Sequence, residues 1–298
     1  MLSDVKPPFR EGYVKGPKDL RLYYRVEGTQ GPTLICSNGI GVSTFFWEPF
    51  AHQLAGKYRV VRWDYRGHGR SDSPRDLRDI SIQTCVDDLA ALMDGLELKT
   101  AVHLGHSMGA QVGFEFYRRY PERVQALVPT LGPYRRAIET FLDSTVSLSL
   151  FAVMKAAIAT SPRLIARSMR PFLVTGVAET FARRLGVVDP HLAPKALILQ
   201  YMEHMLRLDL TSYLALAETL QTQDATDLLP QIKVPVLVVS GERDIFCPTR
   251  LAREMVEQIP GAELLLIPRG THAALIEQPL LLSLRVQRFL EDRVFPRA

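Results

Sequence analysis

The chain has 298 residues, of which 47% are hydrophobic and 23% are charged, and its formal net charge is +4 at pH 7. This length accommodates one sizeable domain with an insertion, and the composition is typical of a globular protein rather than a disordered or fibrous one. The Lys and Arg residues are scattered and form no long run, so we expect no nucleic-acid partner.

The first third of the chain predicts four strands and one helix. Apolar and β-branched runs predict two strands within residues 12–26 and one strand each near 32–37 and 58–63. The helical spacing of apolar residues predicts a helix over 82–96.

A glycine-rich loop, Asn38-Gly39-Ile40-Gly41, follows the strand near 32–37. Its two glycines let the backbone approach a ligand closely and turn its amides inward. We therefore expect the Ile40 amide to donate a hydrogen bond to a substrate oxygen. An ordinary Asn-Gly turn is the structural alternative.

The pentapeptide Gly105-His106-Ser107-Met108-Gly109 lies between a predicted strand at 100–104 and a predicted helix at 110–120. Only very small residues fit two positions before and after a serine in so sharp a turn. Such a turn exposes the serine oxygen and points the following amide, that of Met108, toward a bound acyl oxygen. The motif predicts Ser107 as a nucleophile, although a Gly-Ser-Gly turn also occurs by chance.

A strand is predicted over 124–131, and strand patterns are then absent until the strand at 234–240. Helical periodicities and prolines between them predict a helical cap, residues 133–229, inserted into a core of residues 1–132 and 230–298. Arg135 is a candidate for binding a substrate carboxylate, and a surface role is its alternative. The candidates for an acyl pocket, with packing between cap helices as the alternative, are Phe141, Phe151, Met154, Phe172 and Phe181.

Two further loops carry an acid and a base. Asp244 follows the continuous apolar strand at 234–240, and His272 follows the strand predicted at 263–268. A serine hydroxyl becomes nucleophilic when a histidine takes its proton, and that histidine needs a carboxylate to fix its tautomer. The order Ser107, Asp244, His272 therefore predicts a catalytic triad. Glu242 is the competing acid.

These motifs resemble the α/β-hydrolase superfamily, in the branch with an inserted helical cap. The resemblance covers nearly the whole core and includes the loop from Asp64 to Ser71, which supports the active-site floor in such proteins. It implies an α/β-hydrolase fold, with a mostly parallel eight-stranded sheet, helices on both faces and a cap. Ser107 in place of a nucleophilic aspartate argues against haloalkane dehalogenases and epoxide hydrolases.

The residues Ser37 to Gly41 and Arg62 to Ser71 are also similar to those of 3-oxoadipate enol-lactonases. That similarity indicates a lactone as one substrate class. Many relatives carry histidine where this chain has Asn38, but a backbone amide beyond Gly39 would still bind the oxyanion.

The cysteines and the apolar segments bear on the cellular compartment. The three cysteines, Cys36, Cys85 and Cys247, are odd in number and lack metal-ligand spacing, so we expect reduced thiols in the cytoplasm and no metal site. The first residues lack the apolar core of a signal peptide. The apolar stretch near 146–158 is interrupted by Lys155 and is too short to span a membrane.

Together these features predict a cytoplasmic serine hydrolase of small carboxylic esters or a lactone that needs no metal or organic cofactor. An acyltransferase and a cofactor-free haloperoxidase or perhydrolase use the same triad and are alternatives. A small-molecule receptor that retains the triad is the non-enzymatic alternative. Transfer to an added acceptor, or ligand binding without turnover, would distinguish these. A homodimer is left open.

Overall fold

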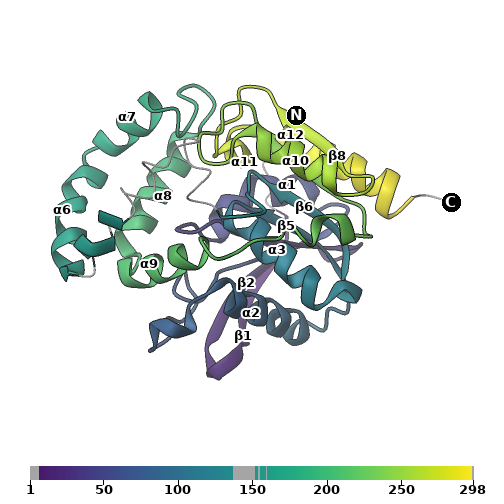
Figure 1. The fold of residues 1–298 in the computed structure, drawn as a ribbon, viewed down its shortest axis with the longest axis horizontal. Coiled ribbons are helices and arrows are strands. Elements are labelled where there is room, and N and C mark those ends of the chain that lie inside the picture. Colours follow the sequence, from purple (N-terminus) through teal and green to yellow (C-terminus); the bar gives the residue numbers. More distant parts are fainter. Residues whose placement is uncertain (1–6, 137–151, 154, 159, 297–298) are drawn as a thin grey trace.

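The protein is built around one eight-stranded sheet (Figure 1). A computed structural model describes residues 7–136, 152–153, 155–158 and 160–296. The strand order is β1-β2-β4-β3-β5-β6-β7-β8. The strands are β1 (Phe9–Lys15), β2 (Arg21–Glu27), β3 (Thr33–Ser37), β4 (Arg59–Trp63), β5 (Ala101–His106), β6 (Val124–Thr130), β7 (Leu237–Gly241) and β8 (Glu263–Ile267).

The sheet is mostly parallel, as predicted. Strands β1, β2 and β4 pair antiparallel, and every pairing from β4 through β8 is parallel. Strands β3, β5 and β7 are buried along their whole length, which accounts for their apolar sequences. The strand order reverses around β3, because β4 lies on one side of it and β5 on the other. Ligands of such sheets bind beyond the carboxyl ends of the strands at this kind of reversal.

One predicted boundary was wrong. The strand expected over 234–240 is regular only from Leu237. Pro235 has no N–H to donate to a neighbouring strand, although its carbonyl accepts a hydrogen bond from the Leu127 N–H. Val236 forms an isolated bridge with Leu127, so the ladder between β6 and β7 begins irregularly.

Helices cover both faces of the sheet, as predicted. Helices α2, α3 and α10 contribute to the hydrophobic cluster on one face, and α1, α11 and α12 contribute to the cluster on the other. These helices are α1 (Glu48–Leu54), α2 (Ile82–Gly95), α3 (Met108–Arg119), α10 (Thr249–Gln258), α11 (Ala274–Glu277) and α12 (Pro279–Phe289).

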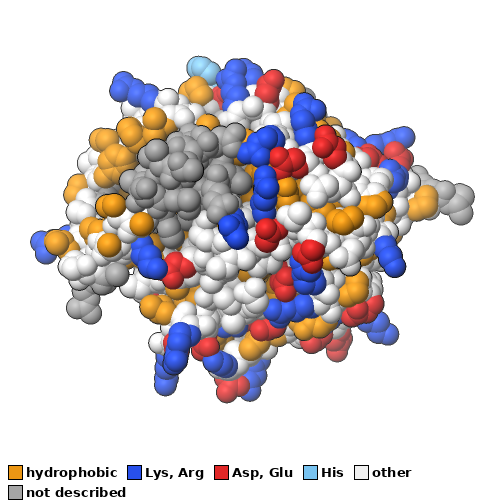
Figure 2. Space-filling view, in the orientation of Figure 1, with side chains coloured by type: hydrophobic (Ala, Val, Ile, Leu, Met, Phe, Trp, Pro, Cys, Tyr) orange, Lys and Arg blue, Asp and Glu red, His pale blue; other side chains and the backbone are white. Residues whose placement is uncertain are grey.

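Between β6 and β7 the described residues form helices and loops but no strand. The insertion helices lie to one side of the sheet in Figure 1 and are α6 (Pro162–Val174), α7 (Val177–Arg184), α8 (Lys195–Arg207) and α9 (Leu210–Thr219). Within the described ranges, no helix combines the length and apolarity needed to cross a membrane. On the face seen in Figure 2, Lys and Arg side chains are interspersed with Asp and Glu side chains.

Candidate active site

Ser107 lies in a strained turn where β5 ends and α3 begins. Its φ is 53° and its ψ is −118°. A Cβ atom at Gly105 would lie 2.2 Å from the carbonyl oxygen of Gly109, and one at Gly109 would lie 2.5 Å from that of Ser37. Both positions therefore require glycine. A non-glycine residue with positive φ costs ~1–3 kcal/mol, and the packing around the turn enforces it here.

The structure brings Ser107, His272 and Asp244 together. The Ser107 Oγ atom lies 3.0 Å from His272 Nε2, and His272 Nδ1 lies 2.9 Å from Asp244 Oδ2. The Asp244 side chain is fully buried, whereas that of His272 is 18% exposed. The Asp244 carboxylate accepts a hydrogen bond from the Nδ1–H group, so Nε2 keeps a lone pair that accepts a hydrogen bond from the Ser107 hydroxyl. The three side chains form one hydrogen-bonded chain.

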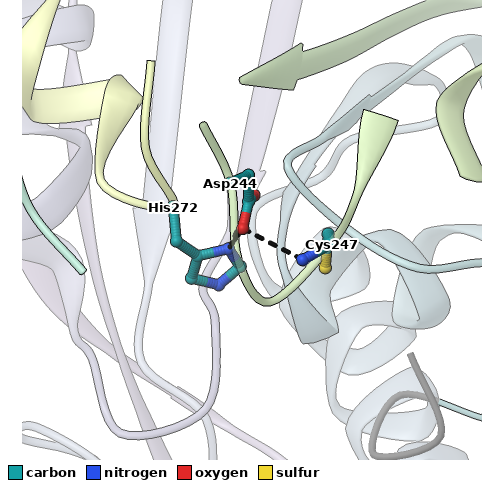
Figure 3. A group of neighbouring side chains, drawn as sticks. All are labelled: Asp244, Cys247 and His272. Atoms are coloured by element: carbon teal, nitrogen blue, oxygen red, sulfur yellow. Dashed lines mark hydrogen bonds and ion pairs between the residues drawn. The ribbon is translucent and has the colours of Figure 1, made fainter. Parts of the chain in front are cut away.

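Backbone amides fix the Asp244 carboxylate. Its Oδ1 atom accepts hydrogen bonds from the N–H groups of Phe246 (2.8 Å) and Cys247 (2.9 Å), as seen for Cys247 in Figure 3. Possible metal-ligating atoms of Asp244, Cys247 and His272 lie within 4.8 Å of one another. The Asp244 oxygens, however, already accept hydrogen bonds from the Phe246 and Cys247 amides and from His272 Nδ1. This geometry fits a triad better than a metal centre.

The competing acid, Glu242, contacts a different group. Its Oε2 atom accepts a hydrogen bond of 2.8 Å from the backbone N–H of Arg269. Arg269 has a φ of 58°, so this contact stabilises an unusual backbone turn before His272. Glu242 therefore has a structural partner of its own, and Asp244 is the acid that contacts His272.

The loop after β3 lies against the serine turn. A Cβ atom at Gly39 would lie 2.9 Å from His106 Nδ1 and 3.1 Å from the Cβ of Ser107. Met108 is the first residue of α3, so its N–H has no acceptor within that helix. The pairing of the Ile40 and Met108 amides at an oxyanion stays a prediction that this close approach favours.

The loop after β4 supports the loop after β3. The Gly41 N–H donates to His68 Nε2 at 3.2 Å, and His68 Nδ1 in turn lies 3.2 Å from the Arg66 carbonyl oxygen. Asp64 accepts hydrogen bonds from the backbone N–H groups of Thr44 (2.8 Å) and Arg70 (3.0 Å). The placement of Asp64, Arg66 and His68 agrees with the supporting role expected from the sequence.

Sequence reasoning assigned no role to His106, the residue before the nucleophile. Its Nε2 atom lies 3.0 Å from the His272 carbonyl oxygen, and its ring stacks obliquely on the rings of His272 and Phe46. The Phe246 ring also packs against the His272 ring, with 4.8 Å between the two ring centroids. Only the position of His106 inside the motif could have indicated this contact.

Three histidines in and below the site are buried as neutral rings. Burial lowers the pKa of His68 to about 4 and that of His103 and His106 to about 3, compared with an ordinary 6.5. Below about pH 6.5 the unfolded chain therefore binds protons that the folded protein excludes, so stability falls as pH decreases. Burial raises the pKa of Asp64 to about 6. Between about pH 4 and 6 the folded protein therefore binds one proton at Asp64 that the unfolded chain does not, which offsets the effect of one histidine.

We expect the free energy of unfolding to fall as the pH decreases from 6 to 5, because His204, whose pKa burial also lowers to about 4, joins the three rings above and the four together exclude more protons than Asp64 takes up. Urea unfolding at pH 7, 6 and 5 measures this. In the variant His103→Gln, the change in the free energy of unfolding per pH unit should be smaller than in the wild type by about 1.4 kcal/mol. A pH-independent free energy in the wild type would contradict the neutral burial of these rings.

The sequence-predicted pocket residues have different positions. Arg135 Nη2 forms an ion pair of 3.1 Å with Glu254, which also accepts hydrogen bonds from Tyr134 and Arg250. Phe172 and Phe181 pack on each other and are 41% and 53% exposed, which agrees with the alternative of packing between the insertion helices. The remaining pocket candidates, Phe141, Phe151 and Met154, lie outside the described residues.

The insertion helices contact the loop after β3. A Cβ atom at Gly41 would lie 3.0 Å from the ring of Tyr213 in α9 and 3.5 Å from the sulfur of Met205 in α8. A separate cavity of about 390 Å³ is lined by both α8 and the loop after β4, including His204 and His68. Ser107 does not line that cavity, so its volume does not measure the space around the nucleophile.

Comparison with known proteins gives a consistent result. A family model described as the alpha/beta hydrolase fold matches residues 32–279. A putative carbamate hydrolase, RutD, of Azorhizobium caulinodans is 28% identical over 86% of this chain and 89% of its own length. The structure of an enol-lactonase from Burkholderia xenovorans LB400 has a TM-score of 0.75 and 24% identity, covering 94% of this chain and 100% of that one. A thermophilic esterase from Thermogutta terrifontis also has a TM-score of 0.75 and 24% identity, covering 95% and 98%.

Proposed function

Because the chain belongs to the family with the alpha/beta hydrolase fold, we propose that it is a serine hydrolase of carboxylic esters, including lactones. The observation that carries this proposal is the hydrogen-bonded chain from Ser107 through His272 to Asp244. The names of similar proteins (carbamate hydrolase, enol-lactonase and esterase) refer to substrates that contain an acyl carbonyl. Attack on such a carbonyl is the chemistry that this arrangement performs.

In the first step, Ser107 Oγ attacks the carbonyl carbon while its proton passes to His272 Nε2. Asp244 stabilises the resulting imidazolium and keeps its ring oriented. The carbonyl oxygen becomes an oxyanion that the Ile40 and Met108 amides bind. Loss of one such donor in other enzymes costs about 2.7–4 kcal/mol of transition-state stabilisation.

The intermediate then collapses, and the bond to the leaving alcohol breaks as His272 donates its proton to that oxygen. An acyl group remains on Ser107. Water attacks this ester with His272 again accepting the proton, and the second collapse releases the carboxylic acid and returns the proton to Ser107. Each step uses side chains and amides of this chain, and the cycle requires no cofactor.

We expect a neutral substrate, because the candidate residue for binding an anionic one already has a partner. The charge of Arg135 is paired with Glu254, which limits its ability to bind a substrate carboxylate. We also propose that residues 133–229 act as a cap over the site, which the contacts of Tyr213 and Met205 near Gly41 support. The buried thiols of Cys36, Cys85 and Cys247 fit the reducing conditions of the cytoplasm.

The test is hydrolysis of p-nitrophenyl esters from acetate to decanoate, with a mono-anionic succinate ester and a carbamate beside them. We expect turnover of the neutral esters with an optimum at one chain length, and weaker turnover of the anionic ester. Transfer to an added alcohol faster than hydrolysis would favour the acyltransferase alternative. No turnover of any acyl compound would contradict the proposal.

A further inference from the structure

The loop between α7 and α8 contacts α11, the helix that begins two residues after His272. Glu277, at the end of α11, joins the two segments through one buried carboxylate. Its Oε1 atom accepts hydrogen bonds from the backbone N–H of Asp189 (2.6 Å) and the hydroxyl of Thr271 (2.7 Å). Its Oε2 atom accepts the backbone N–H of Thr271 at 3.2 Å. Thr271 directly precedes His272.

Asp189 provides a second connection to the same segment. Its side chain is 1% exposed, and Oδ2 forms an ion pair of 3.0 Å with Arg269. Its Oδ1 atom accepts hydrogen bonds from the N–H groups of His191 and Leu192. Burial acts to raise the pKa of Asp189, but these two amides and Arg269 lower it overall, so the carboxylate is charged.

The α7–α8 loop is itself attached to α7. Arg183 donates to the carbonyl oxygens of Asp189 (3.2 Å), Pro190 (2.6 Å) and Ala193 (3.3 Å). Polar contacts therefore run from the insertion through Asp189 and Glu277 to the residue before His272. None of these groups reaches the Ser107 hydroxyl, so the chemistry described above does not account for them.

A buried carboxylate is costly unless donors surround it, and Glu277 has three. Such a group holds its neighbours in one arrangement. His272 Nε2 must stay about 3.0 Å from Ser107 Oγ to accept its proton. The His272 ring contacts the side chains of His106, Ser107 and Asp244. Glu277 does not contact this ring but accepts a hydrogen bond from the backbone N–H of the preceding residue, Thr271.

We propose that Glu277 and Asp189 are positioning residues, which connect the insertion to the His272 segment and thereby set the general base in place. This inference rests on the proposed function, since it concerns the same histidine. It implies that displacement of the α7–α8 loop slows proton transfer to His272 without removing any group that touches the substrate.

The first test is Glu277→Gln. Both carboxylate oxygens accept N–H groups, so the amide nitrogen of glutamine must face a donor on one side. We expect kcat per active site, counted by a p-nitrophenyl acetate burst, to fall ~10- to 100-fold, the scale of a small misplacement of a reacting group. The KM should change little. A fall in the number of active sites, with normal kcat at each, would indicate a merely structural role and overturn the proposal.

The matched control is Glu263→Gln at the other end of β8, where the carboxylate pairs with Arg285 and Arg293. Its kcat per active site should match the wild type, and an equal loss in both variants would overturn the proposal. If Glu277→Gln fails to fold, Asp189→Ala is used instead, with an expected loss of about tenfold. Normal kcat in Asp189→Ala would also overturn it.

A readout without substrate separates this inference from the proposed function. Hydrogen exchange at one of the Asp189 and Thr271 amides should be faster in Glu277→Gln than in the wild type, because the two amides donate to different oxygens of Glu277 and glutamine keeps only one of them. Unchanged exchange at both amides would overturn the connection even if turnover falls. Faster exchange in a protein that hydrolyses no ester would retain the connection and reject the proposed function.

Discussion

Replacement of Ser107 by alanine is expected to abolish ester hydrolysis while leaving the fold intact. The variant Ser107→Ala removes the oxygen that attacks the carbonyl, and no other described hydroxyl is hydrogen-bonded to His272. Removal of the serine of such a triad lowers kcat by about 10⁶-fold in other enzymes. Alanine and serine have similar costs at positive φ, so the turn itself should persist.

The measurement is p-nitrophenyl ester turnover together with circular dichroism and thermal unfolding. Ser283→Ala is the matched control, because this buried serine lies in α12 and donates to the Leu280 carbonyl, away from the site. It should retain the kcat of the wild type. Turnover above one thousandth of the wild-type value in a folded Ser107→Ala variant would show that another group is the nucleophile.

The variant Asp244→Asn is expected to lower kcat by about 10⁴-fold. The oxygen Oδ1 accepts two backbone N–H groups, from Phe246 and Cys247, so the asparagine oxygen will occupy that position. Its NH₂ group then lies where Oδ2 was, 2.9 Å from His272 Nδ1. A donor at that position makes Nδ1 the acceptor and puts the proton on Nε2, which can then no longer accept the proton of Ser107.

Steady-state kinetics of Asp244→Asn beside Glu242→Gln test this assignment. Glu242 is two residues away and bonds the Arg269 backbone, so Glu242→Gln should retain kcat within a few-fold. Strong loss in Glu242→Gln with near-normal activity in Asp244→Asn would assign the acid to Glu242. The positive φ of Arg269 means that Glu242→Gln should be checked for stability as well.

The sheet and the convergence of Ser107, Asp244 and His272 could be predicted because each rests on a local signal. Buried parallel strands have continuous apolar sequences, and loops at their carboxyl ends meet at one edge of the sheet. The turn at Ser107 needs glycine at positions 105 and 109, so five consecutive residues are enough to predict its geometry. The spacing of Asp244 from Gly241 and Pro248 then favoured it over Glu242.

The remaining features depend on contacts between residues far apart in sequence. Glu277 bonds the backbone of Asp189, 88 positions earlier, and Arg135 pairs with Glu254, 119 positions later. No spacing rule connects such residues, because each pair meets only after the insertion packs on the core. The apolar composition of the insertion likewise did not reveal that Phe181 is exposed. Composition gives the number of apolar side chains and not the shape they enclose.

The central claim is a covalent intermediate on Ser107, and mass spectrometry of the acyl-enzyme tests it most directly. The protein is mixed with p-nitrophenyl butyrate, quenched in acid within the first turnover, and analysed intact and after digestion. We expect one butyryl group per chain, on the peptide that contains Ser107, and no such group in Ser107→Ala. A butyryl group on another residue, or turnover without any adduct in the wild type, would contradict the account.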